Sequence, residues 1–346
     1  MKKRIEWIDV AKCFGIFAIF LGHYTGQAGK AYEFVYTHHV ALFFVLSGFS
    51  ESFGTEEDFG KYVVKVIKGL IVPWLMFSVI SIVFCNVLLY NNSLQSVIEN
   101  AILVIKGTIK GQFLASSLWF VTCLVVIKLF FFWIKKIRNK PIILMLCFGM
   151  HLATAYLFPV LSITIPSLPY NADSACYYLI YFALGYCSYT LVDKILSAKT
   201  KVDKILLGIM TLFSLYFSVR LYFGWDIFEF VSEIKYISVI YSMVRPLFVI
   251  WIYIVCAYIF RDVTSFNDIG KNTLFLCGSE YLGRVLLEEV GKMLNIPMTL
   301  YNPLDTVLHT ILLLVCINKF IVPLERILLN KILSIGISIM NLINKK

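Results

Sequence analysis

The sequence predicts an all-α integral membrane protein with about ten transmembrane helices and with both termini in the cytoplasm. The 346 residues are 60% hydrophobic and only 15% charged, and their mean hydropathy is +0.82. No water-soluble domain could cover so much apolar surface. The formal net charge of +10 is therefore read as a bias of membrane loops, and not as the basic surface of a nucleic-acid-binding protein.

Ten apolar runs are long enough to cross a bilayer, with the usual uncertainty of about 2–4 residues at each boundary. They are residues 8–24, 36–53, 70–90, 118–134, 142–158, 175–191, 205–223, 236–260, 273–294 and 304–322. Lysines and arginines gather in every second connection, the most basic of which is residues 135–140. Because basic residues mark cytoplasmic loops, this alternation predicts that both chain ends lie inside the cell.

The segments between and after these runs add no second domain. Residues 97–109 are amphipathic and are predicted to lie in the membrane interface. Residues 1–330 are expected to form one polytopic domain, followed by a short membrane-surface segment at 331–346. The basic start of the chain resembles that of a signal peptide, but the following run contains Asp9 and Lys12 and lacks a small-residue cleavage site. It is therefore interpreted as a retained first helix.

Nine cysteines are spread through the apolar runs without a Cys-x-x-Cys pair. They are interpreted as small buried hydrophobic residues, so neither a disulfide framework nor a metal site is indicated.

The first run carries the most informative polar residues, Asp9, Lys12 and His23. Lys12 and His23 are about three helical turns apart, so they share one face at a separation of roughly 16 Å along the axis. Asp9 lies one turn before Lys12 and can form an ion pair with it. Ionisable groups in a span are costly, at roughly 2.5–3.5 kcal/mol, and by default mark a functional site. The alternative is an interfacial ion pair and a histidine that ends the helix.

His39 begins the second run, so the hairpin between the runs should bring it near His23 in the outer half of the bilayer. A histidine can serve as a general base or as a nucleophile because it titrates near working pH. The two imidazoles would suit removal of a proton from an acceptor hydroxyl during group transfer. The alternative is a hydrogen bond to a backbone carbonyl, which is the preferred interpretation for His38 and His151.

Further charges admit more than one interpretation. Glu280 and Arg284 are one turn apart and can pair, and Arg245 is another partner for Glu280. Such a pair can lock two helices together or belong to the site. The lysines that follow the second run could bind the phosphates of a cytosolic cofactor, could bind lipid headgroups, or could only enforce topology; they are Lys61, Lys65 and Lys68.

The opening Glu6-Trp7-Ile8-Asp9-Val-Ala-Lys12, with Gly22-His23, resembles the start of the membrane-bound acyltransferase type 3 family. It is most similar to the branch of fucose 4-O-acetylases and polysaccharide O-acetyltransferases. That family carries a basic residue, ten residues and then His, and Lys12 and His23 fill this pattern. Most members have Arg at the first place, whereas Lys is familiar in this branch.

Weaker matches extend the resemblance over nearly the whole chain. His39 to Ser47-Gly48-Phe resembles the family's His-x-Pro-Leu-Phe-Phe segment, with Ala41 in place of Pro. Lys65-x-x-Lys68 resembles its basic run before the third helix. In a late helix the family often places a His where this chain has Glu280 instead. The remaining similar segments are Leu118-Trp119-Phe120, Phe182-Ala-Leu-Gly185-Tyr186 and the stretch that begins at Ile269.

The resemblance implies a multi-pass enzyme of the cell membrane that transfers an acetyl group from cytosolic acetyl-CoA, without a metal. The acceptor would be a hydroxyl of a cell-surface polysaccharide or of a lipid-linked sugar. His23 would be the base or the acyl-accepting nucleophile, Lys12 held by Asp9 would orient the site, and His39 would complete it. Lys65 and Lys68 would bind the phosphates of the donor.

Two other classes remain open from the sequence. In a secondary transporter or flippase, Lys12, Glu280 and Arg284 would form a coupling relay, although the two halves of the chain show none of the symmetry typical of transporters. The third class is a structural membrane scaffold. Membrane lipids and the acceptor glycan are the expected partners. The sequence leaves open whether chains associate into a homo-oligomer.

Overall fold

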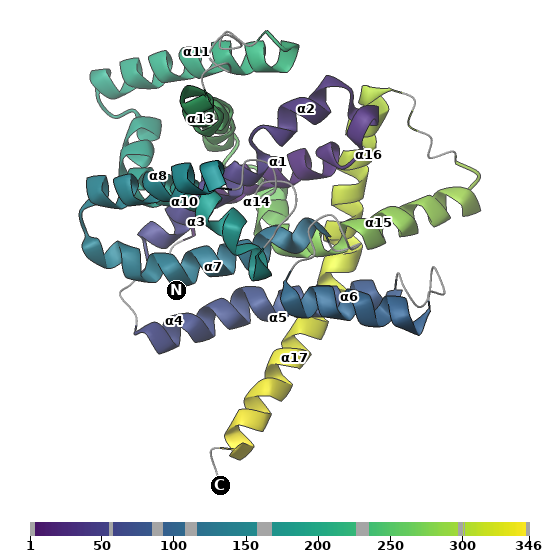
Figure 1. Cartoon of the computed structure of the whole chain (residues 1–346). Helices are drawn as coiled ribbons and strands as arrows, with labels where there is room; N and C mark the ends of the chain where they lie inside the picture. Colours follow the sequence, from purple (N-terminus) through teal and green to yellow (C-terminus); the bar gives the residue numbers. More distant parts are fainter. Residues whose placement is uncertain are drawn as a thin grey trace.

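The computed structural model describes residues 4–54, 58–84, 93–107, 116–157, 168–225, 235–296, 300 and 302–343. Every regular element in these ranges is a helix, which confirms the all-α class (Figure 1). The first part of the chain contains α1 (Glu6–Gly22), η1 (Thr25–Ala28), α2 (Lys30–Tyr36), α3 (His39–Ser52), α4 (Phe59–Val66), η2 (Ile67–Ile71), α5 (Val72–Ser81), α6 (Leu94–Lys106), η4 (Ser116–Leu118), α7 (Trp119–Ile134) and η5 (Lys135–Ile137). The rest contains α8 (Lys140–Leu157), η6 (Pro169–Asn171), α10 (Ala172–Ser197), α11 (Lys201–Phe223), α13 (Lys235–Ile259), α14 (Thr264–Lys271), α15 (Thr273–Met293), α16 (Pro303–Cys316), η7 (Ile317–Ile321) and α17 (Val322–Ile343).

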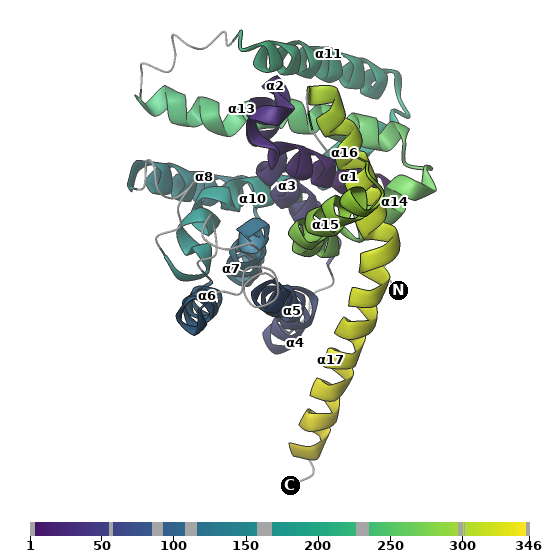
Figure 2. The same cartoon turned by 90° about the vertical axis from the view of Figure 1, so that its right-hand side faces the viewer.

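Helix α1 is the centre of the bundle, and most of its residues are buried, including the charged Asp9. It contacts α2, α3, α13, α14, α15 and α16 (Figures 1 and 2). Its N-terminal residues, such as Trp7 and Val10, join a core built with α3, α7, α8, α10 and α13. Later residues, such as Ile16 and Phe20, join a second core built with α5, α15, α16 and α17. An apolar helix that is covered on every side is buried rather than lipid-facing.

Six helical stretches are long and apolar enough to cross a membrane: Phe59–Phe84, Lys140–Leu157, Pro169–Ser197, Lys201–Phe223, Ile237–Ile259 and Pro303–Gly336. Each overlaps one of the ten predicted spans. Residues 85–90 of the predicted third span and residue 158 of the predicted fifth span lie outside the described residues. The other four predicted spans coincide with α1, α3, α7 and α15. The total of ten spans and the cytoplasmic side of the termini stay predictions.

The helices of the other four predicted spans are too short or too polar to count among these six stretches. Helix α3 has 14 residues, a rise of roughly 21 Å, against a hydrocarbon core about 30 Å thick. Helices α1 and α7 have 17 and 16 residues and are packed among other helices. Helix α15 has 21 residues but carries Glu280, Arg284, Glu288 and Glu289, which lower its hydropathy.

Two predictions concern segments beside the bundle. The amphipathic segment at 97–109 falls on α6, which ends at Lys106. Residues 108 and 109 lie outside the described residues. The predicted boundary at 330 falls inside α17, which continues from α16 and η7 and extends away from the other helices (Figures 1 and 2). The membrane-surface position of residues 331–346 stays a prediction.

Helices α3 and α10 cross at two glycines that the sequence motifs contain. A Cβ on Gly48 would lie 2.1 Å from the Phe182 carbonyl oxygen, and a Cβ on Gly185 would lie 2.1 Å from the Val45 carbonyl oxygen. No side chain fits at either place, because backbone atoms cannot yield as a flexible side chain can. Small residues allow this close approach of helices in membrane proteins. The crossing fixes α3, and therefore His39, relative to the bundle.

Replacing either glycine by alanine should loosen this crossing. We expect Gly48→Ala and Gly185→Ala to destabilise the protein by about 1–3 kcal/mol, the usual cost of overpacking, seen as a lower midpoint of thermal unfolding in detergent. Gly149→Ala in α8 is the matched control, since no atom lies within 4 Å of its added Cβ. Equal unfolding midpoints for all three variants would contradict the role of the crossing.

Candidate active site

The C-terminal end of α1 and the N-terminal end of α3 meet at one cavity. His23 caps α1 and His39 is the first residue of α3, with η1 and α2 forming the turn between them. Both histidines line a cavity of about 30 Å³, whose other walls are Ile19, Val40, Phe43, Ser117, Trp119 and Phe120. The hairpin therefore brings together the two imidazoles as the sequence predicted.

Glu280 of α15 holds His23 from the other side. The Nδ1 atom of His23 lies 2.7 Å from Oε2 and 2.9 Å from Oε1 of Glu280. The Glu280 side chain is only 6% exposed, whereas that of His23 is 31% exposed. Arg284, one turn further along α15, donates to Glu280 Oε1 at 2.6 Å. The two polar partners satisfy the buried Glu280 carboxylate. Because the His23 imidazole is partly exposed, a substrate can still reach it.

The contact with Glu280 decides which nitrogen of His23 carries the proton. An ionised carboxylate only accepts hydrogen bonds, so Nδ1 of His23 must donate to it. In the neutral ring, Nε2 then has a free lone pair and can accept a proton. The backbone oxygen of Val35, 2.6 Å from Nδ1 of His39, imposes the same tautomer on His39. Both histidines are therefore held in the form that a general base requires.

Side-chain hydrogen bonds attach α15 to the helices that surround it. Ser279, next to Glu280, donates to the buried carboxylate of Glu325 on α17. The Asn272 amide donates to Asn318 Oδ1 at 2.7 Å, and Ser117 Oγ donates to the backbone oxygen of Cys277 at 2.9 Å. These contacts join the part of α15 that precedes Glu280 to η4, η7 and α17, which fixes the helix next to the Glu280 carboxylate.

Further contacts hold Arg284 in place beside Glu280. The Arg284 guanidinium lies 4.1 Å above the centre of the Tyr24 ring and also donates to the backbone oxygen of Phe20 at 3.3 Å. The Tyr24 hydroxyl is 2.5 Å from Nδ1 of His309 on α16. Arg284 is thereby fixed by α1 as well as by Glu280, which orients the carboxylate toward His23.

Asp9 and Lys12 lie at the opposite end of α1. Lys12 Nζ is 3.5 Å from Asp9 Oδ1, as the sequence predicted, but Asp9 also accepts from Arg4 Nε at 2.5 Å. Arg4 was not part of the predicted site. The coupling relay of the transporter hypothesis does not come together. Lys12 pairs with Asp9, whereas Glu280 contacts Arg284 and His23 at the other end of α1. Roughly 16 Å of helix separates the two.

The remaining predicted residues have simpler surroundings. Lys65 on α4 and Lys68 on η2 are exposed and do not line the His23 cavity. His38 and His151 donate to the backbone oxygens of Phe34 and Tyr177 at 3.0 and 2.8 Å, in agreement with the preferred interpretation.

Sequence reasoning left open whether Glu280 locks two helices together or belongs to the site. It noticed the charge within an apolar run but offered only Arg284 and Arg245 as partners. The structure pairs Glu280 with Arg284 and with His23. The family pattern, which has a histidine late in the chain, pointed to the correct helix, and here a carboxylate occupies that place.

Comparison with known proteins identifies the family of the chain. Residues 5–317 match the family model described as an acyltransferase domain of the acyltransferase 3 type. No curated protein and no solved structure matches the chain. The family match covers nearly the whole chain, including all helices that contribute to the His23 cavity. The chain belongs to the acyltransferase 3 family and is a multi-pass membrane acyltransferase.

Proposed function

We propose that this protein is an O-acetyltransferase of the cell membrane, in the branch of fucose 4-O-acetylases and polysaccharide O-acetyltransferases. The donor is cytosolic acetyl-CoA, and the acceptor is a hydroxyl of a cell-surface polysaccharide or of a lipid-linked sugar. The observation that carries the proposal is the contact between Glu280 and His23 beside a cavity shared with His39. The Lys-rich loop at 135–140 and both termini face the cytoplasm in this proposal.

The geometry supports general-base transfer. Nε2 of His23 takes the proton of the acceptor hydroxyl, whose oxygen attacks the carbonyl carbon of the acetyl thioester. The carbon–oxygen bond forms, the carbon–sulfur bond breaks, and the departing thiolate receives the proton from His23. Glu280 compensates the positive charge of the ring between these steps, as the carboxylate of a Ser-His-Asp triad does. Acyl transfer through His23 itself is the other route to the same products.

Asp9 and Lys12 act as positioning residues in this proposal. Asp9 is buried and accepts from both Arg4 and Lys12, so the ammonium of Lys12 is held on the face of α1 that also carries His23. Lys12 supplies a positive charge on the path of an anionic donor. It does not touch the reacting atoms at the His23 end.

The size of the His23 cavity supports a short acyl group. About 30 Å³ is room for a few small atoms, since a single water needs about 10–15 Å³. The rings of Phe43 and Phe120, whose centres lie 5.9 Å apart, both line this space. An acetyl group fits this limit better than longer acyl groups do.

Replacing His23 by alanine should abolish transfer while the protein still folds. A general base contributes about 10²–10⁴-fold in rate, and a nucleophilic role would make the loss larger. Glycan acetylation in cells and acetyl transfer by the purified protein measure the activity, and thermal unfolding measures the fold. His151→Ala is the control, because this histidine bonds only to a backbone oxygen among the described contacts of its ring nitrogens. Near-normal transfer by a folded His23→Ala protein would disprove the assignment.

Widening the cavity should change which acyl group is accepted. We expect Phe120→Ala to raise the rate with propionyl-CoA relative to acetyl-CoA by about 10-fold or more, since one methylene in a pocket is worth about 10–200-fold. Phe130 lies on the same helix and is 45% exposed. Phe130→Ala should therefore leave the ratio of the propionyl-CoA rate to the acetyl-CoA rate unchanged. An unchanged ratio in a folded Phe120→Ala protein would place the acyl group elsewhere.

A further inference from the structure

Helix α2 places a half-exposed tyrosine beside the His23 site. Tyr36 is the last residue of α2 and is 49% exposed. Its ring centre lies 4.9 Å from that of His39, and the two rings meet edge to face. A Cβ on Gly22, the residue before His23, would lie 3.0 Å from Cε2 of Tyr36. Tyr36 therefore contacts the end of α1 and the start of α3, next to both histidines of the site.

Neighbouring groups fix the direction of the Tyr36 ring. The ring centre of Tyr32, one turn earlier on α2, lies 4.7 Å from that of Tyr36, as is usual for residues four apart on a helix. The Tyr36 hydroxyl is near enough to Glu280 for the charge of that carboxylate to act on it. No hydrogen bond links this hydroxyl to the part of the chain that the structure describes. The ring thus reaches toward the contact between Glu280 and His23 with a polar group that a ligand can use.

The size of the His23 cavity leaves an acceptor sugar outside it. The cavity measures about 30 Å³, the space of about two or three waters, so a sugar ring does not fit. The reacting hydroxyl must still come within hydrogen-bond distance of Nε2 of His23. The sugar ring must therefore lie on the exposed side of His23. Tyr24, which follows His23, is 7% exposed and is covered by Arg284, so Tyr36 is the open one of these two tyrosines.

The chemistry of α2 fits a neutral sugar better than an anionic lipid headgroup. A tyrosine offers a flat apolar ring and a polar hydroxyl at low entropic cost, which matches the C–H face and the hydroxyls of a sugar ring. The charged residues of α2 are Lys30 and Glu33, both exposed, so the helix has no net charge. A surface for anionic headgroups would carry an excess of lysine or arginine.

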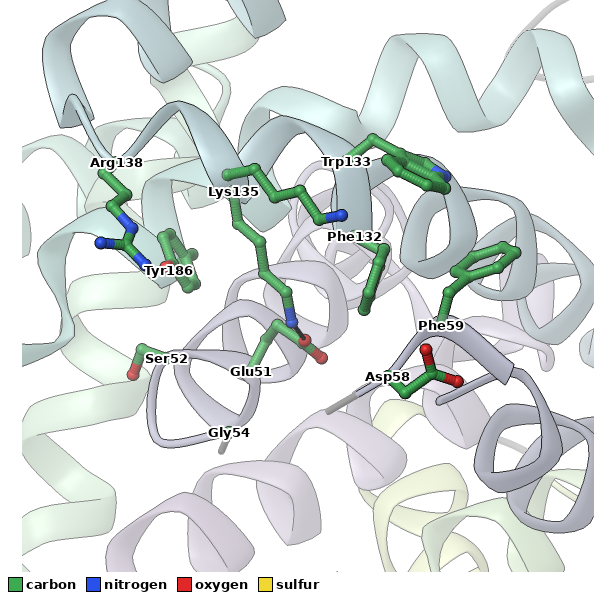
Figure 3. Close-up of a pocket in the computed structure, with 11 residues that line it drawn as sticks. Glu51, Ser52, Gly54, Asp58, Phe59, Phe132, Trp133, Lys135, Arg138 and Tyr186 are labelled. Atoms are coloured by element: carbon green, nitrogen blue, oxygen red, sulfur yellow. Dashed lines mark hydrogen bonds and ion pairs between the residues drawn. The ribbon is translucent and has the colours of Figure 1, made fainter. Parts of the chain in front are cut away.

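The opposite end of α3 is too far from His23 to hold the reacting sugar. A cavity of about 610 Å³ lies there, and Figure 3 shows Lys135 directed toward Glu51 in it. Glu51 accepts from Lys135 at 2.6 Å and from Lys128 at 2.8 Å. Along α3, Glu51 lies at a rise of roughly 18 Å from His39. A sugar in that cavity could not place a hydroxyl at His23, so the acceptor belongs at the α2 end.

We propose that Tyr36, supported by Tyr32, binds the acceptor, and that its ring stacks on the neutral sugar whose hydroxyl gives its proton to His23. The inference rests on the proposed function and adds the residue that recognises the sugar. The acyl group occupies the small cavity behind His23 and His39, whereas the sugar stays outside it on α2. The two substrates therefore meet at His23 without competing for one space.

The test measures acetyl transfer by the detergent-purified chain to surface glycan isolated from cells that lack the protein. We expect Tyr36→Ala to raise the KM for this glycan about 10-fold or more, a usual loss for an aromatic anchor. The KM for acetyl-CoA and kcat should stay within about 2-fold, because only acceptor binding is removed. Tyr36→Phe keeps the ring and should stay close to the unaltered chain in all three constants.

The matched control is Tyr222→Ala. Tyr222 is 40% exposed and packs against Phe34 of α2, with no described contact with His39 or Gly22. It should leave the glycan KM unchanged. Thermal unfolding establishes that each variant is folded. Tyr36→Leu, which keeps apolar volume without a ring, replaces Tyr36→Ala if that variant does not fold.

Every other outcome overturns the inference in a distinct way. An unchanged glycan KM in folded Tyr36→Ala removes the acceptor from Tyr36 and leaves the proposed function intact. A lower kcat at an unchanged KM makes Tyr36 only a structural neighbour of His39. An equal loss in Tyr36→Phe excludes stacking. A KM change found only in phosphatidylglycerol vesicles, and not in detergent, assigns Tyr36 to the membrane interface. If the unaltered chain acetylates no glycan, the proposed function is wrong and the inference falls with it.

Discussion

The hydrogen bond between His23 and Glu280 joins residues 257 positions apart, and the proposed chemistry depends on it. A histidine at the end of a helix can rotate and can adopt either tautomer. Glu280 removes both freedoms because its carboxylate accepts the Nδ1 proton and is itself held by Arg284. Arg284 in turn lies on Tyr24, next to His23 in the chain. These contacts between α1 and α15 fix His23, and in the proposed mechanism its Nε2 atom takes the proton.

The bundle is arranged so that this contact can exist inside a membrane. Helix α1 carries charges at both ends and is surrounded by other helices, so its charges face protein rather than lipid. Helices α3 and α7 are short for spans, and the N-terminal ends of both line the His23 cavity.

The sequence predicted the parts of this site that depend on local spacing. The helical period places Lys12 and His23 on one face, and the short turn after α1 brings His39 beside His23. Contacts between distant segments have no such signal. Periodicity does not tell which apolar run packs beside another, so only Arg284 and Arg245 were offered as partners of Glu280, and Glu51 at the end of α3 was not noticed. Gly48 and Gly185 entered the family resemblance as motif residues, and only the structure shows that their backbones touch.

The most direct test of the account is a double-mutant cycle between His23 and Glu280, measured as the rate of acetyl transfer per folded molecule. Glu280→Gln keeps the side-chain volume and removes the charge, and Glu289→Gln, on the exposed side of the same helix, is its control. If Glu280 acts through His23, Glu280→Gln lowers the rate in the unaltered chain but causes no further loss in the His23→Ala chain. Losses that multiply would show that the two residues act independently, and would contradict the account.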